Sequence, residues 1–162
     1  MKVIFQGTFD PFTSGHLEVV KSALAIFDEV RILLLVNPDK TPLFSLEERI
    51  KMIRQSVTPW PQVTVDSYDG LLVDYMQQHG YRACVRGVRN ETDVSYELAN
   101  HHLSQQIYPD LQTLFLPCAI AYHKISSSAV KAACSAGKLP AAWVPKPVAV
   151  YLKKKFPSLT FL

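Results

Sequence analysis

The chain has 162 residues, of which 48% are hydrophobic and 19% charged, and its formal net charge is +3. This length suits one domain over residues 1–162, and the small positive charge suits a small anionic substrate rather than a nucleic-acid partner. No apolar run approaches the length of a membrane span, so we expect no membrane partner. The three isolated cysteines form no ligand or disulfide pattern, so we expect reduced thiols, no metal site built by the protein, and a cytoplasmic location.

Short apolar runs alternate with amphipathic segments along the chain. The run at residues 30–36 is almost continuously apolar, which favours a parallel sheet covered on both faces. Ser45 and Glu48 form a capping-box pattern that predicts a helix start, whereas Gly80 and Gly137 predict helix ends. The expected strands cover residues 3–5, 30–36, 63–65, 82–85 and 111–116. The expected helices cover about residues 14–27, 45–57, 71–78, 92–107, 126–136 and 148–155.

This alternation predicts an α/β protein with a Rossmann-like, doubly wound sheet of five parallel strands and helices on both faces. In such sheets, ligands bind beyond the carboxyl ends of the strands, where the strand order reverses. The side chains with chemistry to offer follow those ends, so we expect them along one rim of the sheet. They are Thr8, His16, Lys40, Arg86, Arg89 and the serines at 126–128.

The residues expected at this rim are suited to binding phosphate. The strand, Gly-containing loop and helix start before His16 form a pattern that places backbone N–H groups and a positive dipole end together. Arg86 and Arg89 can clamp phosphate oxygens, and the serines at 126–128 add hydroxyls at a second helix start. Taken singly, these residues would be a surface histidine, solvated arginines and a helix cap. Together they predict an anion site in which His16 donates to a phosphate, most strongly if its ring is protonated.

Several reaction classes are disfavoured because their motifs are missing from the sequence. There is no GxGxxG after the first strand, no GxxxxGK[ST] and no GxSxG. A dinucleotide dehydrogenase, a P-loop NTPase and a triad hydrolase are therefore unsupported. A site made of phosphate ligands suits nucleotidyl transfer, because an ionised phosphate can attack without a general base.

The motifs taken together resemble the bacterial phosphopantetheine adenylyltransferase family nearly from end to end. Thr13-Ser14-Gly15-His16 matches the T/HxGH signature of the whole nucleotidyltransferase superfamily, whereas RGxR followed by DxxYE is far more specific. The matching segments are residues 7–11, 13–16, Lys40 with 42–49, 86–89, 93–97 and 125–128. The resemblance implies transfer of AMP from ATP to 4′-phosphopantetheine, with dephospho-coenzyme A and pyrophosphate as products. It also implies Mg²⁺, bound mainly through the ATP phosphates, and a homohexamer.

The resemblance also implies roles for individual residues. His16 would stabilise the transition state, and Thr8, Lys40 and Arg86 would share the catalytic site with it. Thr8, Lys40, Leu72 and Arg86 would bind the acceptor. The nucleotide would be bound by Thr8, Phe9, His16, Gly87, Val88, Arg89, Glu97, Tyr122, His123, Lys124, Ile125, Ser126, Ser127 and Ser128.

Two other readings of the sequence stay open. One is another small nucleotidyltransferase, acting on nicotinamide or nicotinate mononucleotide or transferring a cytidylyl group. Those families tend to end in an ISSTxxR-like motif, whereas residues 126–131 here lack the arginine. The other is a nucleotide-binding module without activity, against which the presence of His16, Lys40, Arg86 and Arg89 argues. A class I aminoacyl-tRNA synthetase shares the HxGH-type site but is longer and carries a KMSKS segment.

Overall fold

The computed structural model describes residues 1–39 and 41–162, so Lys40 lies outside the described residues. The main strands are β1 (Lys2–Gly7), β2 (Glu29–Leu35), β3 (Val63–Tyr68), β4 (Ala83–Val88) and β5 (Gln112–Pro117). The helices are α1 (Ser14–Leu24), α2 (Leu46–Ser56), α3 (Leu72–His79), α4 (Glu91–Ile107), α5 (Ser127–Ser135) and α6 (Lys146–Lys155). Two short 3₁₀ turns, Ile120–Tyr122 and Ala141–Trp143, flank α5, and the last strands are β6 (Lys138–Leu139) and β7 (Thr160–Phe161).

The five main strands form one parallel sheet in the order β3-β2-β1-β4-β5. The predicted Rossmann-like sheet is therefore confirmed. The chain moves outward from β1 to β3 and then returns to β4, so the order reverses between β1 and β4. Every residue of β1 pairs with β2, whereas only Ile4 and Phe5 pair with β4. Beyond Phe5 the two strands no longer pair.

Both faces of the sheet are buried, as the continuous apolar runs predicted. Val3 and Phe5 belong to a large hydrophobic cluster with residues of α1, α2, α5 and α6. Ile4, which points to the opposite face, belongs to a second cluster with Tyr75 and Met76 of α3. Helices therefore cover both faces of the sheet.

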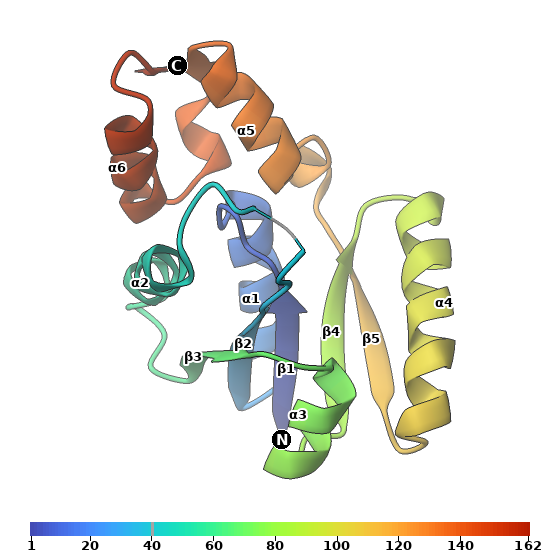
Figure 1. Ribbon diagram of the computed structural model, residues 1–162. Helices are drawn as coiled ribbons and strands as arrows, with labels where there is room; N and C mark the ends of the chain where they lie inside the picture. The colour runs from blue at the N-terminus through green and yellow to red at the C-terminus, as the bar shows by residue number, and fades with distance from the viewer. Residues whose placement is uncertain (40) are drawn as a thin grey trace.

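The last part of the chain contains the two predicted helices, α5 and α6, and two short strands that the sequence did not predict. β6 and β7 pair in parallel as a small second sheet. In Figure 1, α5 and α6 lie beyond the carboxyl end of β1, and α6 lies beside α2. Leu139, Val148 and Leu152 join the large hydrophobic cluster, so this part of the chain is continuous with the core.

Most helix boundaries follow local signals in the sequence. Ser45 and Glu48 form the predicted capping box of α2. Gly80 and Gly137 have φ of 66° and 80°, a left-handed conformation that favours glycine after a helix. Within the described residues, no helix is both long enough and apolar enough to cross a membrane.

Candidate active site

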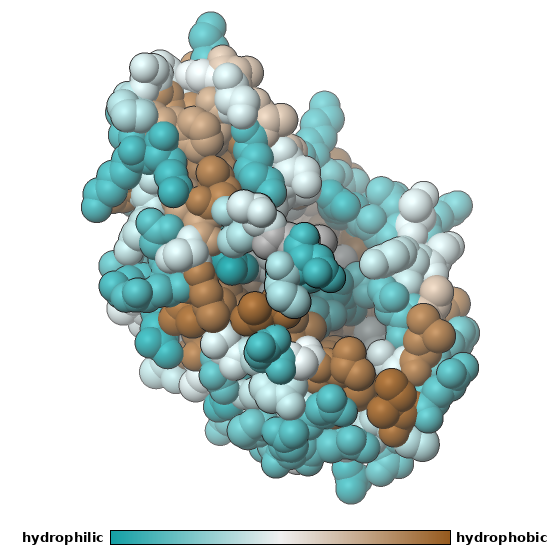
Figure 2. Space-filling view, in the orientation of Figure 1, coloured by the Kyte–Doolittle hydropathy of each residue, from teal (hydrophilic) through white to brown (hydrophobic). Residues whose placement is uncertain are grey.

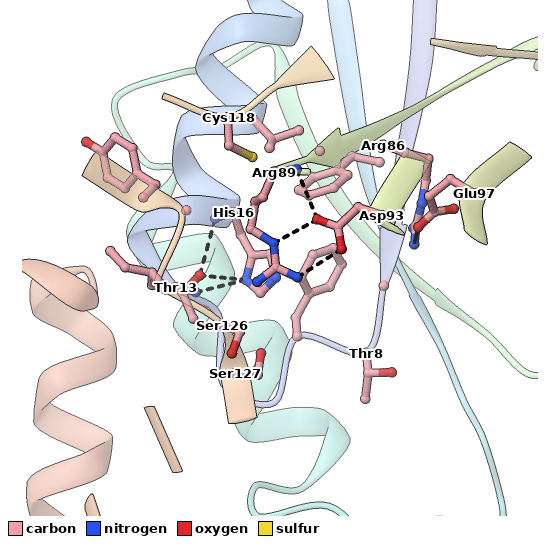
Figure 3. Close-up of a pocket in the computed structure, with 18 of the residues that line it drawn as sticks. Thr8, Thr13, His16, Arg86, Arg89, Asp93, Glu97, Cys118, Ser126 and Ser127 are labelled. Atoms are coloured by element: carbon pink, nitrogen blue, oxygen red, sulfur yellow. Dashed lines mark hydrogen bonds and ion pairs between the residues drawn. The ribbon is translucent and has the colours of Figure 1, made fainter. Parts of the chain in front are cut away.

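A cavity of about 320 Å³ lies in the crevice between the carboxyl ends of β1 and β4. Figure 3 shows its walls, which come from the loop after β1, the first turn of α1, the end of β4, the start of α4 and the segment before α5. This is the place where doubly wound sheets bind ligands. The predicted residues that line it are Thr8, Phe9, His16, Arg86, Gly87, Arg89, Glu97, Tyr122, Ile125, Ser126 and Ser127.

The loop after β1 is held in place by buried polar contacts. The Asp10 carboxylate is almost fully buried and accepts the backbone N–H groups of Leu43 (2.8 Å) and Phe44 (3.0 Å). Arg49, also buried, donates from Nη1 to the carbonyl of Thr8 at 2.8 Å. The segment before α2 and the loop before α1 are therefore tied to each other, which fixes one wall of the cavity.

Helix α1 begins with a reciprocal cap between Thr13 and His16. The Thr13 hydroxyl accepts the His16 backbone N–H at 3.3 Å, and the Thr13 backbone N–H donates to His16 Nδ1 at 3.0 Å. Because Nδ1 accepts this bond, the neutral ring carries its proton on Nε2. Phe9 and Phe12 pack against the ring, with centroids 5.0 and 5.5 Å from its own. The cap therefore leaves Nε2–H as the ring donor available to a ligand in the cavity.

The environment of His16 keeps its ring neutral. Burial, together with the positive charges of Arg86 and Arg89, lowers the pKa of His16 from 6.5 to about 4. The sequence suggested a protonated ring as the strongest form of the catalytic donor. The structure instead favours a neutral donor at physiological pH.

Arg86, at the end of β4, is held by two partners. Its Nη2 donates to Glu97 Oε1 at 2.5 Å, and its Nη1 donates to the carbonyl of Gln6 at 2.7 Å. Its Nε is buried and has no hydrogen-bond partner among the described residues. A buried donor without a partner is costly, so this N–H is available to an acceptor that enters the cavity.

Arg89 is held by Asp93 in a two-point ion pair. Arg89 Nε and Nη2 lie 2.9 and 3.3 Å from the two Asp93 oxygens, and the Arg89 backbone N–H donates to Oδ2 at 3.0 Å. The pair raises the pKa of Arg89 and lowers the pKa of Asp93. The sequence predicted Arg86 and Arg89 as clamps facing phosphate, whereas the structure shows each of them fixed first by a carboxylate of α4.

Helix α5 brings a second N-terminus to the cavity. Ser126 is its N-cap, and the Ser126 hydroxyl accepts the Ala129 backbone N–H at 3.0 Å. The Ser127 hydroxyl donates to the carbonyl of Pro11 at 2.8 Å, which ties this helix to the loop after β1. The N-termini of α1 and α5 therefore both face the cavity, where their dipoles and free N–H groups favour an anion.

Some predicted residues lie elsewhere. Leu72 packs against the second hydrophobic cluster, and Lys124 and Ser128 are exposed outside the cavity. Val88 and His123 line a neighbouring groove, where His123 Nε2 lies 3.0 Å from the carbonyl of Cys118. Their predicted roles, and that of Lys40, remain predictions.

From the sequence, no binding or catalytic role was expected for several other residues of the cavity, among them Gln6, Thr13, Asp93, Tyr96 and Cys118. Asp93 had a readable signal, because it opens the DxxYE motif and stands four residues before Glu97 on the same helix face. In the structure both carboxylates face an arginine.

The fold is that of a nucleotidyltransferase. Residues 4–133 match the model of the family described as cytidylyltransferase-like. Three curated relatives are each named phosphopantetheine adenylyltransferase. The chain is 39% identical to one from Dictyoglomus turgidum over 96% of this chain and 98% of the relative. Those from Thermotoga neapolitana (40% identity; 96% of each chain) and Shouchella clausii (41%; 96% and 98%) match similarly. The chain therefore belongs to the phosphopantetheine adenylyltransferase family.

A solved structure supports the fold independently. It is a bifunctional NMN adenylyltransferase/ADP ribose pyrophosphatase from Francisella tularensis, complexed with AMP and a manganese ion. The TM-score is 0.71 at 17% identity, and the match covers 98% of this chain and 51% of the other. The chain thus spans about half the length of that protein, and the likeness concerns the fold alone.

Proposed function

We propose that this protein transfers AMP from ATP to 4′-phosphopantetheine and forms dephospho-coenzyme A and pyrophosphate. Family membership supports this reaction. The structural observation that carries it is the convergence of two helix N-termini and the His16 Nε2–H on one cavity. Such a site stabilises charge on phosphoryl oxygens.

The reaction needs positioning more than proton transfer. A phosphate oxygen of the acceptor forms a bond to the α-phosphorus of ATP, and the bond from that phosphorus to the bridging oxygen breaks as pyrophosphate leaves. The attacking phosphate is already ionised near neutral pH, so no general base is required. Among the described residues, both carboxylates of the cavity, Asp93 and Glu97, are engaged by arginines. His16 is placed to donate from Nε2 to a phosphoryl oxygen whose charge grows in the transition state.

We assign the two substrates to different parts of the rim. Arg89, Glu97 and the start of α5 would hold the nucleotide. Thr8, Lys40 and Arg86 would hold the phosphate of the acceptor. Leu72 lies in the first turn of α3, after the carboxyl end of β3, so the pantetheine arm would extend from the cavity across the ends of β1 and β2 toward α3.

The donor set bears on how Mg²⁺ would bind. Among the described residues, no group of three or more His, Cys, Asp or Glu side chains is placed to hold a metal ion. Asp93 and Glu97 are already ion-paired. We therefore propose that Mg²⁺ enters on the phosphate oxygens of ATP, where it would neutralise part of their charge.

We also propose a homohexamer, and α4 supports an assembly. Glu97 is the only residue of α4 that is buried in the single chain. Leu98, Leu103 and Ile107 are 42%, 62% and 52% exposed. Figure 2 shows apolar side chains at the lower right of the molecule, where the C-terminal end of α4 lies in Figure 1. Light scattering should give six chains per particle, and Leu103→Asp should reduce that number; a monomer at micromolar concentration would contradict the assembly.

The acceptor can be identified by pyrophosphate release from ATP and Mg²⁺ with a panel of phosphorylated compounds. The panel should include 4′-phosphopantetheine, nicotinamide mononucleotide, nicotinate mononucleotide and phosphocholine, the last also with CTP. We expect release with 4′-phosphopantetheine alone. Release with a mononucleotide and none with phosphopantetheine would contradict the proposed function.

A further inference from the structure

Helix α4 faces the cavity with two carboxylates one turn apart, and each meets a different arginine of the β4 end. Glu97 meets Arg86, and Asp93 meets Arg89. We infer that Asp93 is a positioning residue, which orients the Arg89 guanidinium so that its remaining donors face the phosphates of ATP. This inference rests on the proposed nucleotide site.

The Asp93 carboxylate is itself fixed. It lies in the first turn of α4, whose N-cap, Asn90, accepts the Asp93 backbone N–H at 2.9 Å. The Arg89 backbone N–H donates to the same carboxylate oxygen as the Arg89 side chain does. Backbone and side chain of Arg89 are therefore held by one group, so rotation of the side chain away from Asp93 would break two hydrogen bonds.

The pairing leaves one edge of the guanidinium for a ligand. Asp93 takes the edge formed by Nε and Nη2. No described residue accepts a hydrogen bond from the two N–H groups of Nη1 or from the second N–H group of Nη2. These groups lie at the outer end of the guanidinium, where two parallel N–H groups match two oxygens of a phosphate. In Figure 3, Asp93 and Arg89 meet beside His16, at the same cavity wall. A guanidinium that is already oriented loses less conformational entropy when ATP binds.

The same carboxylate also repels the anionic substrate, so the two effects of Asp93 oppose each other. The hydrogen bonds from Arg89 lower the pKa of Asp93, so its charge is present throughout the physiological pH range. If repulsion dominated, removal of the charge would tighten ATP binding. The two-point geometry and the partly buried position of the pair favour positioning, so removal should weaken ATP binding about tenfold, which corresponds to about 1.4 kcal/mol.

The test is calorimetric titration of ATP with Mg²⁺, without acceptor, into the full chain and its variants. Asp93→Ala and Asp93→Asn should each raise the ATP dissociation constant about tenfold, and kcat at saturating ATP should change less than twofold. Asn90→Ala is the matched control, because it removes the cap of the same helix without a contact to Arg89. It should lower Tm and leave the ATP dissociation constant unchanged.

The decisive arm uses the Arg89→Ala background, in which Asp93→Ala should have no further effect on ATP binding. An equal loss in both backgrounds would show that Asp93 does not act through Arg89 and would overturn the inference. Unchanged or tighter ATP binding in the single Asp93 variants would overturn it as well, while the proposed function would stand. Failure of the unmodified chain to bind ATP would instead contradict the proposed function and the inference together.

Discussion

The backbone N–H of Thr13 donates to Nδ1 of His16, and this contact fixes the proton of the neutral imidazole on Nε2. The pair of residues that caps α1 thus contains the proposed catalytic donor. In the usual capping box, the third helical residue is Glu or Gln, whose side chain accepts the cap N–H. Here His16 occupies that position and accepts through Nδ1, which leaves Nε2–H for the proposed contact with a phosphoryl oxygen.

His16→Ala should lower kcat by about 10²–10³ and leave ATP binding nearly unchanged. The reason is that the Nε2–H bond strengthens as charge develops on the phosphoryl oxygen, so its loss is felt mainly in the transition state. Steady-state kinetics and ATP titration on the same preparation measure the two effects. His102→Ala, at an exposed position on α4, is the control. A near-normal kcat with a raised KM for ATP would reduce His16 to a binding residue.

Stability should depend on pH through His16. The pKa of His16 is about 4 in the folded protein, and its ordinary value of 6.5 applies in the unfolded chain. Below pH 6.5 the unfolded chain therefore binds more protons than the folded one. The free energy of unfolding should therefore fall as the pH falls from about 6.5 toward 4. Denaturant titrations at several pH values should show this slope, and His16→Gln should reduce it. An equal slope in both proteins would contradict the assigned neutral state.

Two glycines of the cavity should respond in opposite ways to alanine. A β-carbon at Gly87 would lie 2.6 Å from Val19 Cγ2, so Gly87→Ala should lower Tm. A β-carbon at Gly15 would meet no atom closer than 3.6 Å, so Gly15→Ala should leave Tm unchanged or slightly raised. It would nevertheless fill part of the cavity and should weaken ATP binding. Thermal melts and ATP titration separate the two cases, and a large loss of Tm in Gly15→Ala would show that Gly15 serves the fold instead.

Asp10→Ala should destabilise the protein by about 2 kcal/mol or more, because two buried backbone N–H groups would lose their acceptor. The nearby Lys131, whose Nζ lies 3.7 Å from the carboxylate, would also lose its partner. Chemical denaturation measures the change. Asp69→Ala, at an exposed position, should shift the free energy of unfolding by less than about 0.5 kcal/mol. Equal effects of the two substitutions would contradict the anchoring role of Asp10.

The parts of the fold that local patterns encode could be predicted from the sequence. The strands around Val3 and Leu33 are buried on both faces, so their apolar runs identified them. The helix cap at Ser45 and the helix end at Gly80 depend on residues that are close in sequence, so they could be predicted too. β6 and β7 have two residues each, too few for any periodicity to show.

The gathering of site residues at one rim also followed from the sequence, because parallel strands end together. The ion-pair partners and the protonation state of these residues did not follow from the sequence. Arg86 meets Glu97 only because α4 folds back along β4 and β5, and the pKa of His16 depends on burial that the chain acquires by folding. The capping role of Thr13 was not predicted, because the capping pattern normally has Glu or Gln where His16 stands.

The central claim, adenylyl transfer to 4′-phosphopantetheine, can be tested by following the α-phosphorus of ATP. The protein is incubated with Mg²⁺, 4′-phosphopantetheine and ATP labelled with ³²P at the α-position, and the products are separated by chromatography. We expect the label in dephospho-coenzyme A, with unlabelled pyrophosphate formed in equal amount. Label found only in free AMP or in unreacted ATP would contradict the account.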